Sequence, residues 1–545
     1  MVRGRAGLIA TLSLLLAVTL AGCGGSGGAA PSNGGPPPPP GAQTDVVTYK
    51  NDVARTGQNL SESTLTPANV SSSTFGKLRM LTVDGKVDAQ PLLLSALTVQ
   101  GAAHNVVFVA TENDSVYAFD ADTGAQLWNV SVLGAGESPS GLPPSGCNQV
   151  APTIGITATP VIDRSAGAHG SIFVVGMSKT STGTYHQRLH ALDVTSGAEQ
   201  PGSPVDVTAT YPMTGGVTTF DPAQYEERAA LLLTGGTIYT SWTSHCDVAP
   251  YSGWVIAYSE STLAQTAVFN AAPNSGGVGP AIWMSGGGPA ADASGNVYLL
   301  TANGAFETML DANGFPNGGD YGNSFLKLTA SGSTLSVSDY FALYNGVSLS
   351  NADQDLGSGG ILLLPDQTDS GGAVRHLAVG AGKDGNLYVV NRDSMGKFNA
   401  SSNNVWQQLS GVLGAGIFST PAYYNGTLYY GPNGGALLAF TVSGARVSSS
   451  PSSTSPGVFA YPGTAPAVSA NGTTAGIVWA VENSSPAVLH AYDAGNLAHE
   501  LYNSNQAASG RDQFGSGNKF ITPVIANGKV FLGTQNAVAV FGLLN

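Results

Sequence analysis

Residues 106–128 read VVFVATENDSVYAFDADTGAQLW and hold two apolar, strand-like runs on either side of the polar residues 112–114. Such a pair predicts a β-hairpin, and the Asp-Thr-Gly after it predicts a tight turn into a further strand. Seven related segments follow, 49 to 73 residues apart, each with an apolar strand that ends in a turn residue: LHALD from Leu189, VIAYS from Val255, FLKLT from Phe325, LYVVN from Leu387, LLAFT from Leu437, LHAYD from Leu489 and VAVFG from Val538. Eight repeats of short strands without a helical pattern predict an all-β chain folded as an eight-bladed β-propeller.

The two ends of this repeat array complement each other. The eighth repeat stops at Asn545 before a fourth strand can form, whereas FGKLRMLTV, residues 75–83, is a strand-like segment ahead of the first repeat. Pairing these two parts would close the ring and leave no unpaired sheet edge. A β-solenoid is the alternative, but its coils are shorter and carry no hairpin in every unit.

The composition fits a large folded domain. The 545 residues include 34 acidic and 20 basic side chains, so the net charge of −14 argues against a nucleic-acid partner. Charged residues make up 10% and hydrophobic residues 42%, which is enough apolar material for a large core, and three cysteines are too few for a disulfide scaffold. We expect a monomer.

The N-terminus resembles a bacterial lipoprotein signal. Arg3 and Arg5 precede an apolar run that ends in Leu-Ala-Gly-Cys at Cys23, and this run is too short to span a bilayer comfortably. The resemblance implies that residues 1–22 are a signal peptide and that Cys23 is diacylated, which anchors the exported chain to a membrane. An ordinary secretory signal with a chance cysteine is the alternative. Gly24 and Gly25 lack the Asp that retains such proteins in the inner membrane, which favours the outer membrane, facing the periplasm.

Three domains follow from this pattern. Residues 23–44 contain five consecutive prolines among Gly, Ala and Ser, and this composition predicts a flexible, disordered linker. Residues 45–545 are expected to form the propeller.

The first repeat also resembles a known family. Its motif, A-x-D-x-x-T-G-x-x-x-W, is similar to the pyrroloquinoline-quinone (PQQ)-type propeller repeat and consists of Ala118, Asp120, Thr123, Gly124 and Trp128. The resemblance implies that the Trp docks between blades and that Thr-Gly makes the turn into the outer strand. Quinoprotein dehydrogenases with this blade have an adjacent cysteine pair, a calcium ion and a catalytic Asp. Here Cys147 and Cys246 stand far apart, and the one calcium-like run, with oxygens on Asn351, Asp353 and Asp355, lacks the terminal Glu. A solvated loop is the alternative for that run.

Strand parity predicts which face carries the binding site. In a four-stranded antiparallel blade, the blade connections and the second-to-third loops leave on the same side. The long segments of this chain fall in those two classes, namely 133–155, 208–227, 271–287, 342–358, 178–187, 243–253 and 303–324. Loops on a rigid scaffold are the usual place for binding. The candidates at this face are Gln90, Glu112, Arg228, His245, Asp247, Asn303 and Lys383.

Cys147 and Cys246 both belong to that face. In an exported protein this predicts a disulfide that fixes the loop after blade one near blade three. The opposing argument is that these blades are not neighbours, so that the loop must cross blade two.

Two functions remain open. The first is a membrane-tethered, extracytoplasmic binding or scaffold module for a protein or small-molecule ligand, similar to the eight-bladed outer-membrane assembly lipoprotein. The alternative is a periplasmic PQQ-dependent oxidoreductase of alcohols or sugars. The sequence assigns no catalytic residue, no metal and no cofactor, and PQQ with calcium belongs to the alternative only.

Overall fold

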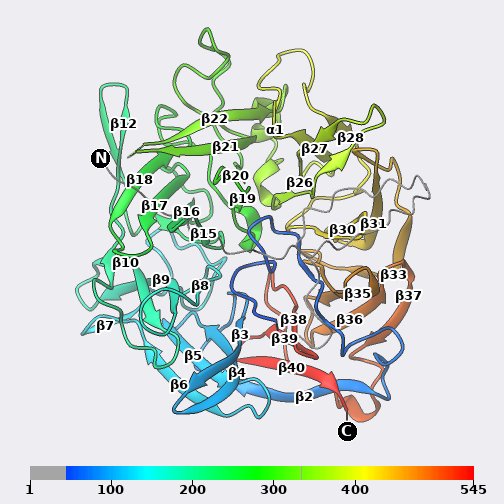
Figure 1. The fold of residues 1–545 in the computed structure, drawn as a ribbon. Coiled ribbons are helices and arrows are strands. Elements are labelled where there is room, and N and C mark those ends of the chain that lie inside the picture. The colour runs from blue at the N-terminus through cyan, green and yellow to red at the C-terminus, as the bar shows by residue number, and fades with distance from the viewer. Residues whose placement is uncertain (1–43, 333, 545) are drawn as a thin grey trace, which may run out of the picture. The chain divides into compact units, whose positions relative to one another are not determined.

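The computed structural model describes residues 44–332 and 334–544. This part of the chain is almost entirely β-structure, with one short helix, α1 (Gly346–Asn351), and three 3₁₀ turns, η1 (Met284–Gly286), η2 (Leu356–Ser358) and η3 (Ala508–Gly510). Eight sheets of four or five strands follow one another around a ring (Figure 1), and the predicted all-β, eight-bladed propeller is confirmed. The predicted signal peptide, Cys23 and all of the predicted linker except Thr44 lie outside the described residues.

The first four blades, each written from the inner to the outer strand, have the following bounds. Blade one consists of β3 (Leu92–Val99), β4 (Ala102–Ala110), β5 (Ser115–Asp120) and β6 (Gln126–Ser131). Blade two consists of β8 (Val161–Asp163), β9 (Ser171–Thr180), β10 (Tyr185–Asp193) and β11 (Val205–Asp206), and β7 (Glu137–Pro139) also pairs with β9. Blade three consists of β15 (Leu232–Thr234), β16 (Thr237–Ser244), β17 (Trp254–Ser259) and β18 (Gln265–Asn270), and β14 (Tyr225–Glu226) also pairs with β16. Blade four consists of β19 (Ala290–Ala291), β20 (Val297–Leu300), β21 (Ser324–Ser331) and β22 (Thr334–Ala342).

The other four blades repeat this order. Blade five consists of β23 (Leu362–Leu363), β26 (Leu377–Ala381), β27 (Leu387–Asn391) and β28 (Gln407–Leu409). Blade six consists of β29 (Ala422–Tyr424), β30 (Thr427–Tyr430), β31 (Gly435–Ser443) and β33 (Ser453–Phe459), and β32 (Arg446–Val447) also pairs with β31. Blade seven consists of β34 (Ala467–Asn471), β35 (Thr474–Glu482), β36 (Val488–Asp493) and β37 (Asn496–Asn503). Blade eight consists of β38 (Val524–Ala526), β39 (Lys529–Gly533), β40 (Ala537–Leu543) and β2 (Phe75–Thr82). Two hairpins, β12 (Thr210–Met213) with β13 (Gly216–Thr219) and β24 (Gln367–Thr368) with β25 (Val374–Arg375), stand outside the blades.

Blade eight contains both ends of the repeat array. Strand β2 runs antiparallel to β40, from Phe75 opposite Leu543 to Thr82 opposite Ala537, and supplies the outer strand. The fully buried Phe75 ring packs on Phe541 of the same blade and on Trp479 and Tyr502 of blade seven. The closing strand therefore also joins two blades through their side chains.

The residues of the blade-one motif make the turn and the contact with the next blade. Asp120 Oδ1 accepts hydrogen bonds from the backbone N–H groups of Asp122 (2.9 Å) and Thr123 (2.6 Å). Gly124 follows with φ +81°, a left-handed conformation that favours glycine. The Trp128 indole N–H donates to the Val194 carbonyl of blade two at 3.1 Å. Asp120 thus stabilises the turn, and Trp128 joins neighbouring blades.

The middle of the ring is filled by residues 46–59, which we call the central segment (Figure 1, dark blue). Its backbone, with the side chains of Arg55 and Asn59, bonds in or beside the innermost strand of every blade in turn. The partners, from blade one to blade eight, are Leu93, Ile162, Leu231, Ala291, Leu363, Tyr423, Val468 and Ile525. At its end, β1 (Gln58–Asn59) adds a parallel strand to β34. The central segment is therefore a hub that contacts all eight blades.

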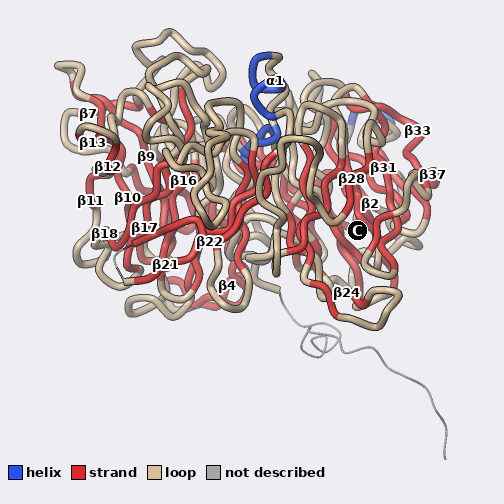
Figure 2. The backbone as a smooth tube through the Cα atoms, turned by 90° about the horizontal axis from the view of Figure 1, so that it is seen from above, coloured by secondary structure: helices blue, strands red, loops and turns tan. Residues whose placement is uncertain are grey.

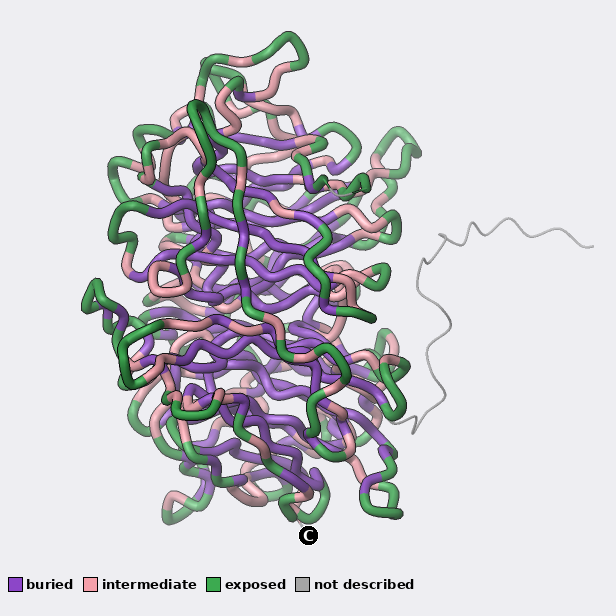
Figure 3. The backbone as a smooth tube through the Cα atoms, turned by 90° about the vertical axis from the view of Figure 1, so that its left-hand side faces the viewer, coloured by how far each residue is buried: buried purple, intermediate pink, exposed green. Residues whose placement is uncertain are grey.

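The core lies between the blade faces. The strands are mostly buried, whereas the loops at both ends are exposed (Figure 3). No helix in residues 44–332 and 334–544 has the length and apolar character needed to cross a membrane.

Candidate functional site

The two faces of the propeller carry different loops. The connection with α1 lies on one face, together with the longer loops, and the β24–β25 hairpin lies on the opposite side (Figure 2). We call the face with α1 the long-loop face. The opposite face carries short turns, such as Asn527-Gly528 between β38 and β39.

A cavity of about 120 Å³ opens at the centre of the long-loop face. The connection that enters each of the eight blades contributes to its wall, and two second-to-third loops add one residue each. The lining residues are Lys86, Asp88, Gln149, Val150, Glu226, Arg228, Asp247, Trp283, Ser285, Asp355, Ser358, Lys383, Phe418, Tyr461, Lys519 and Phe520. Its volume is comparable with cavities of ~150 Å³ that hold a benzene ring.

Three of the seven candidates from the sequence line this cavity: Arg228, Asp247 and Lys383. Gln90 does not. Its side chain accepts a hydrogen bond from the backbone N–H of Lys50 (3.1 Å) and donates to the carbonyl of Thr48 (3.4 Å), so it supports the central segment.

Glu112 lies behind the cavity wall. Its Oε2 accepts hydrogen bonds from Gly155 N–H and Thr157 Oγ1, both at 2.9 Å. Burial and the neighbouring Asp88 carboxylate raise the pKa of Glu112 well above its ordinary value, which favours a protonated side chain. Asp88 lines the cavity and pairs with Lys86 at 2.7 Å. Glu112 therefore supports the wall that Asp88 presents.

Lys383 is held by two aspartates from the connection between blades four and five. Its Nζ lies 2.7 Å from Asp353 and 2.6 Å from Asp355. Asn303 joins this cluster: its backbone N–H donates to Asp355, and its Nδ2 donates to Asp353. Burial raises the pKa of Asp355. The wall at this side of the cavity is a fixed lysine–carboxylate cluster.

This cluster also includes two of the three calcium candidates from the sequence. The carboxylates of Asp353 and Asp355 face Lys383, whereas Asn351 is the exposed last residue of α1. Within the described residues, no group of three or more His, Cys, Asp or Glu side chains is placed to hold a metal ion. The described part of the chain thus offers no ready carboxylate set for calcium at this position.

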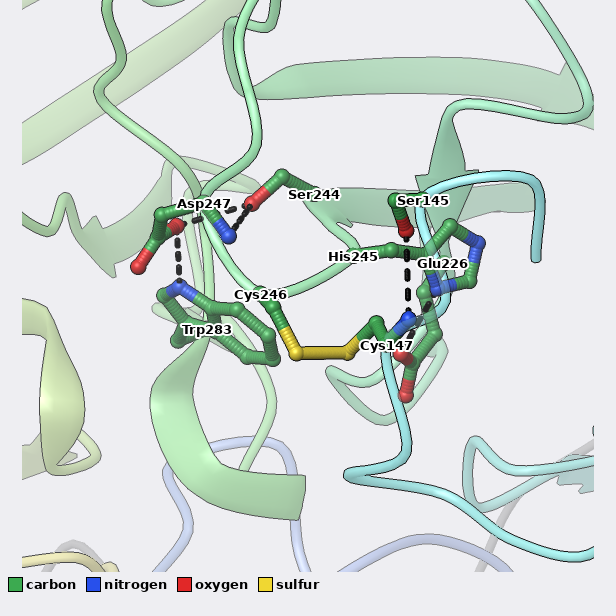
Figure 4. The surroundings of a disulfide bond; sticks show 8 residues. All are labelled: Ser145, Cys147, Glu226, Ser244, His245, Cys246, Asp247 and Trp283. Carbon is green, nitrogen blue, oxygen red and sulfur yellow. Dashed lines mark hydrogen bonds and ion pairs between the residues drawn. A yellow bond between two sulfur atoms is a disulfide. The ribbon is translucent and has the colours of Figure 1, made fainter. Parts of the chain in front are cut away.

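Next to the cavity, Cys147 and Cys246 form a disulfide across loops that are 99 residues apart in the chain. Cys246 and Asp247 both have left-handed backbones, with φ of 56° and 53°. Figure 4 shows the Trp283 indole beside the disulfide, with its N–H donating to Asp247 at 3.1 Å. On the other side of the bridge, the buried His245 lies 3.4 Å from Glu226. The disulfide therefore fixes the loops that carry one wall of the cavity.

An ion pair ties the loop with Cys147 to blade two. Arg188 in β10 donates two hydrogen bonds to the Glu137 carboxylate, at 2.7 and 2.8 Å, and Ser178 Oγ adds a third at 2.7 Å. The Arg188 hydrogen bonds are the largest cause that lowers the pKa of Glu137 to about 2. The charged carboxylate is thus a clamp on the loop 133–155.

This clamp predicts a pH dependence of stability. A lowered carboxyl pKa stabilises the fold above the unfolded value near 4.5, and this contribution is lost as the pH falls from there through about 2. Glu137→Gln is therefore expected to be less stable than the wild type at pH 7 and to lose less stability between pH 4.5 and 2. Urea midpoints measured across that range test this. Asp206→Asn is the matched control, because Asp206 bonds the same arginine but is 58% exposed. If the urea midpoint falls equally with pH for Glu137→Gln and the wild type between pH 4.5 and 2, the proposed role of the Glu137–Arg188 pair is wrong.

The aromatic lining was not expected from the sequence. Trp283, Phe418, Tyr461 and Phe520 all lie in blade connections, which do not share the repeat pattern of the strands. The one sequence signal that could have found them is an aromatic residue shortly before an inner strand.

Comparisons with known proteins agree with the propeller. A family model described as outer membrane protein assembly factor BamB matches residues 45–200. None of the curated proteins matches the chain. Among solved structures, quinohemoprotein alcohol dehydrogenases from Comamonas testosteroni and Pseudomonas putida HK5 superpose with TM-scores of 0.58 and 0.59, each at 12% identity and over 92% of this chain and 80% of theirs. A europium-containing methanol dehydrogenase superposes with a TM-score of 0.58 at 13% identity, over 92% of this chain and 98% of its own. At these identities the likeness shows the fold alone.

Proposed function

Since the chain belongs to the PQQ-type β-propeller family, we propose that it is an extracytoplasmic binding module that holds a small organic molecule in its central cavity. The observation that carries this proposal is the convergence of all eight blade connections on one cavity. A concave site with aromatic walls and a few fixed charges is typical of small-molecule binding.

The side chains of the cavity wall indicate which class of ligand the cavity can hold. Trp283, Tyr461 and Phe520 offer flat apolar surface for a ring, while the charged side chains offer directed hydrogen bonds. The disulfide and the Lys383 cluster keep two walls in place without a ligand, and such preorganisation lowers the cost of binding. A flat, polar organic molecule therefore fits better than an extended protein surface.

The second candidate is a PQQ-dependent oxidoreductase, and the chemistry of one wall favours it. Trp283 beside the disulfide would face the flat ring of the quinone, and Lys383 and Arg228 would hold its anionic oxygens. When bound, the quinone would accept the two electrons and the hydrogen of an oxidised alcohol. Asp355, buried and with a raised pKa, is the group in this wall that could take up the alcohol proton. The ring of Trp283 and the two cations thus suit a flat anionic quinone in their chemistry, whereas the described residues hold no group of three or more carboxylates placed for calcium.

The two candidates separate in one experiment. Isothermal titration of the purified full chain with a panel of neutral and anionic ring compounds, and with PQQ in the presence and absence of calcium, measures binding. Trp283→Ala is expected to weaken any ligand of this cavity about tenfold or more. Trp406→Ala is the control, because Trp406 stacks on Arg375 and Arg446 outside the cavity and its loss is expected to leave binding unchanged.

Each outcome decides between them. PQQ binding followed by reduction of an artificial electron acceptor on addition of alcohols would establish the oxidoreductase and replace the binding module. Binding of ring compounds without dye reduction supports the binding module. No binding of any compound in the panel would overturn both.

The proposal includes the location of the protein. Residues 1–22 act as a lipoprotein signal and Cys23 as the lipid anchor, which places the propeller outside the cytoplasm and favours the periplasmic side of an outer membrane. The match to the BamB family model supports a location outside the cytoplasm. Labelling of the expressed protein with radioactive palmitate, lost in Cys23→Ser, tests the anchor.

A further inference from the structure

The four cations in the cavity wall are not equally partnered. Lys86 pairs with Asp88, and Lys383 pairs with Asp353 and Asp355. By contrast, Arg228 and Lys519 have no ion pair and no hydrogen bond from their side chains within the described residues. Both line the cavity, so two of its four positive charges face it without a protein acceptor.

The lack of a hydrogen-bond acceptor costs the most free energy at Arg228. Its side chain is only 3% exposed, and a guanidinium carries five N–H donors that need acceptors when they leave water. The guanidinium stacks on the ring of Phe520, with Cζ 4.9 Å from the ring centre, so that its edge is free for a bidentate partner.

Lys519 adds a second charge to the same corner. It precedes Phe520 in the chain, and its Nζ lies 5.6 Å from the ring centre of Tyr461. Burial is the largest cause that lowers the pKa of Lys519, followed by the charges of Lys86 and Arg228. Lys86, Arg228 and Lys519 thus lie near one another, and the carboxylates of Asp88 and Glu226 offset part of their repulsion. An anion in contact with Arg228 and Lys519 would relieve more of it.

From these contacts we infer that Arg228 and Lys519 form an oxyanion subsite, which takes the carboxylate or phosphate of a ligand whose ring lies against Phe520 and Tyr461. A bidentate contact from a guanidinium and a point charge from an ammonium suit both oxyanions. The inference rests on the proposed small-molecule site and names its ligand class: a ring compound with one acidic group.

Titration of the full chain with four probes tests the subsite: benzoate, phenyl phosphate, inorganic phosphate and the neutral analogue benzamide. The wild type is expected to bind benzoate or phenyl phosphate about tenfold or more tightly than benzamide, because charge-assisted hydrogen bonds are added. Stronger binding of phenyl phosphate identifies a phosphate ester as the ligand, and stronger binding of benzoate identifies a carboxylic acid. Inorganic phosphate shows whether the subsite needs the ring.

Three variants at two positions test which residues bind the anionic group. Lys519→Gln and Arg228→Met are each expected to weaken the anionic probe about tenfold while leaving benzamide unchanged, and Arg228→Lys is expected to restore part of the loss. Lys529→Gln is the matched control, since Lys529 pairs with Asp122 outside the cavity. Lys519 is half-buried at the edge, so its variant remains informative if Arg228→Met does not fold.

The results distinguish two failures. Benzamide and benzoate binding with equal affinity, insensitive to Lys519→Gln, would overturn the subsite and leave the binding module intact. Failure of all four probes, together with failure of the wider panel that includes PQQ, would overturn the proposed function itself.

Discussion

Arg55→Ala is expected to lower the free energy of unfolding by about 4 kcal/mol or more, the largest effect of any single substitution considered. The guanidinium is fully buried and donates to Thr48 Oγ1 (2.7 Å) and to the carbonyls of Tyr49 (2.9 Å), Pro289 (2.9 Å) and Leu231 (3.1 Å). Removal of the side chain leaves these acceptors buried and unsatisfied, at about 1–3 kcal/mol each. The bonds also tie the central segment to blades three and four.

Denaturant unfolding followed by tryptophan fluorescence measures this loss. Arg446→Ala is the control, since Arg446 is exposed and stacks on Trp406 at the outer edge, where we expect a change below about 1 kcal/mol. Hydrogen exchange adds a spatial test, because loosening of the hub should increase exchange in the inner strands β15 and β19. An Arg55→Ala protein as stable as Arg446→Ala would show that the central segment adds little to the fold.

Phe75→Ala is expected to cost about 3–5 kcal/mol, as is usual for loss of a buried phenylalanine. Its ring lies 5.0 Å from Tyr502, 5.4 Å from Trp479 and 6.2 Å from Phe541, measured between ring centres. The substitution removes the side-chain contact that joins the closing strand β2 to blade seven, so blade eight should open before the others.

Thermal unfolding together with hydrogen exchange of β2 and β40 tests this. Phe315→Ala is the comparison, because Phe315 packs on Tyr340 from a partly exposed loop and its loss should cost less. Exchange that rises uniformly around the ring, instead of first in blade eight, would contradict the closing role of Phe75.

The fold could be predicted because its information is local and repeated. An apolar run that ends in a turn residue, as at Asp120 or Asp193, specifies strand and turn within a few residues, and eight copies then specify the ring. Strand parity predicted the face on which Arg228, Asp247 and Lys383 lie, and the structure shows that these three line a cavity there. These results need only the order of the strands.

The central segment and much of the site could not be predicted, because their contacts join residues far apart in the chain and do not repeat from blade to blade. Two of the four partners of Arg55, Leu231 and Pro289, lie in blades three and four, 176 and 234 residues away in the chain, and nothing in its neighbourhood marks it as buried. Asp355 was a calcium candidate by its spacing, but its partner Lys383 comes from the next blade. Trp283 and Phe520 lie in unrepeated connections. Contacts between blades leave no periodic trace in the sequence.

The path of the central segment has a mechanical consequence. It starts beside the short turn at Asn527, where the backbone N–H of Thr44 donates to Asn527 Oδ1 at 2.9 Å, on the side away from the cavity. Tension applied at the N-terminus, as by a lipid tether, would act first on the central segment, which bonds to every blade. Because the central segment bonds to all eight blades, such a load would be shared around the ring and would not separate one sheet from the others.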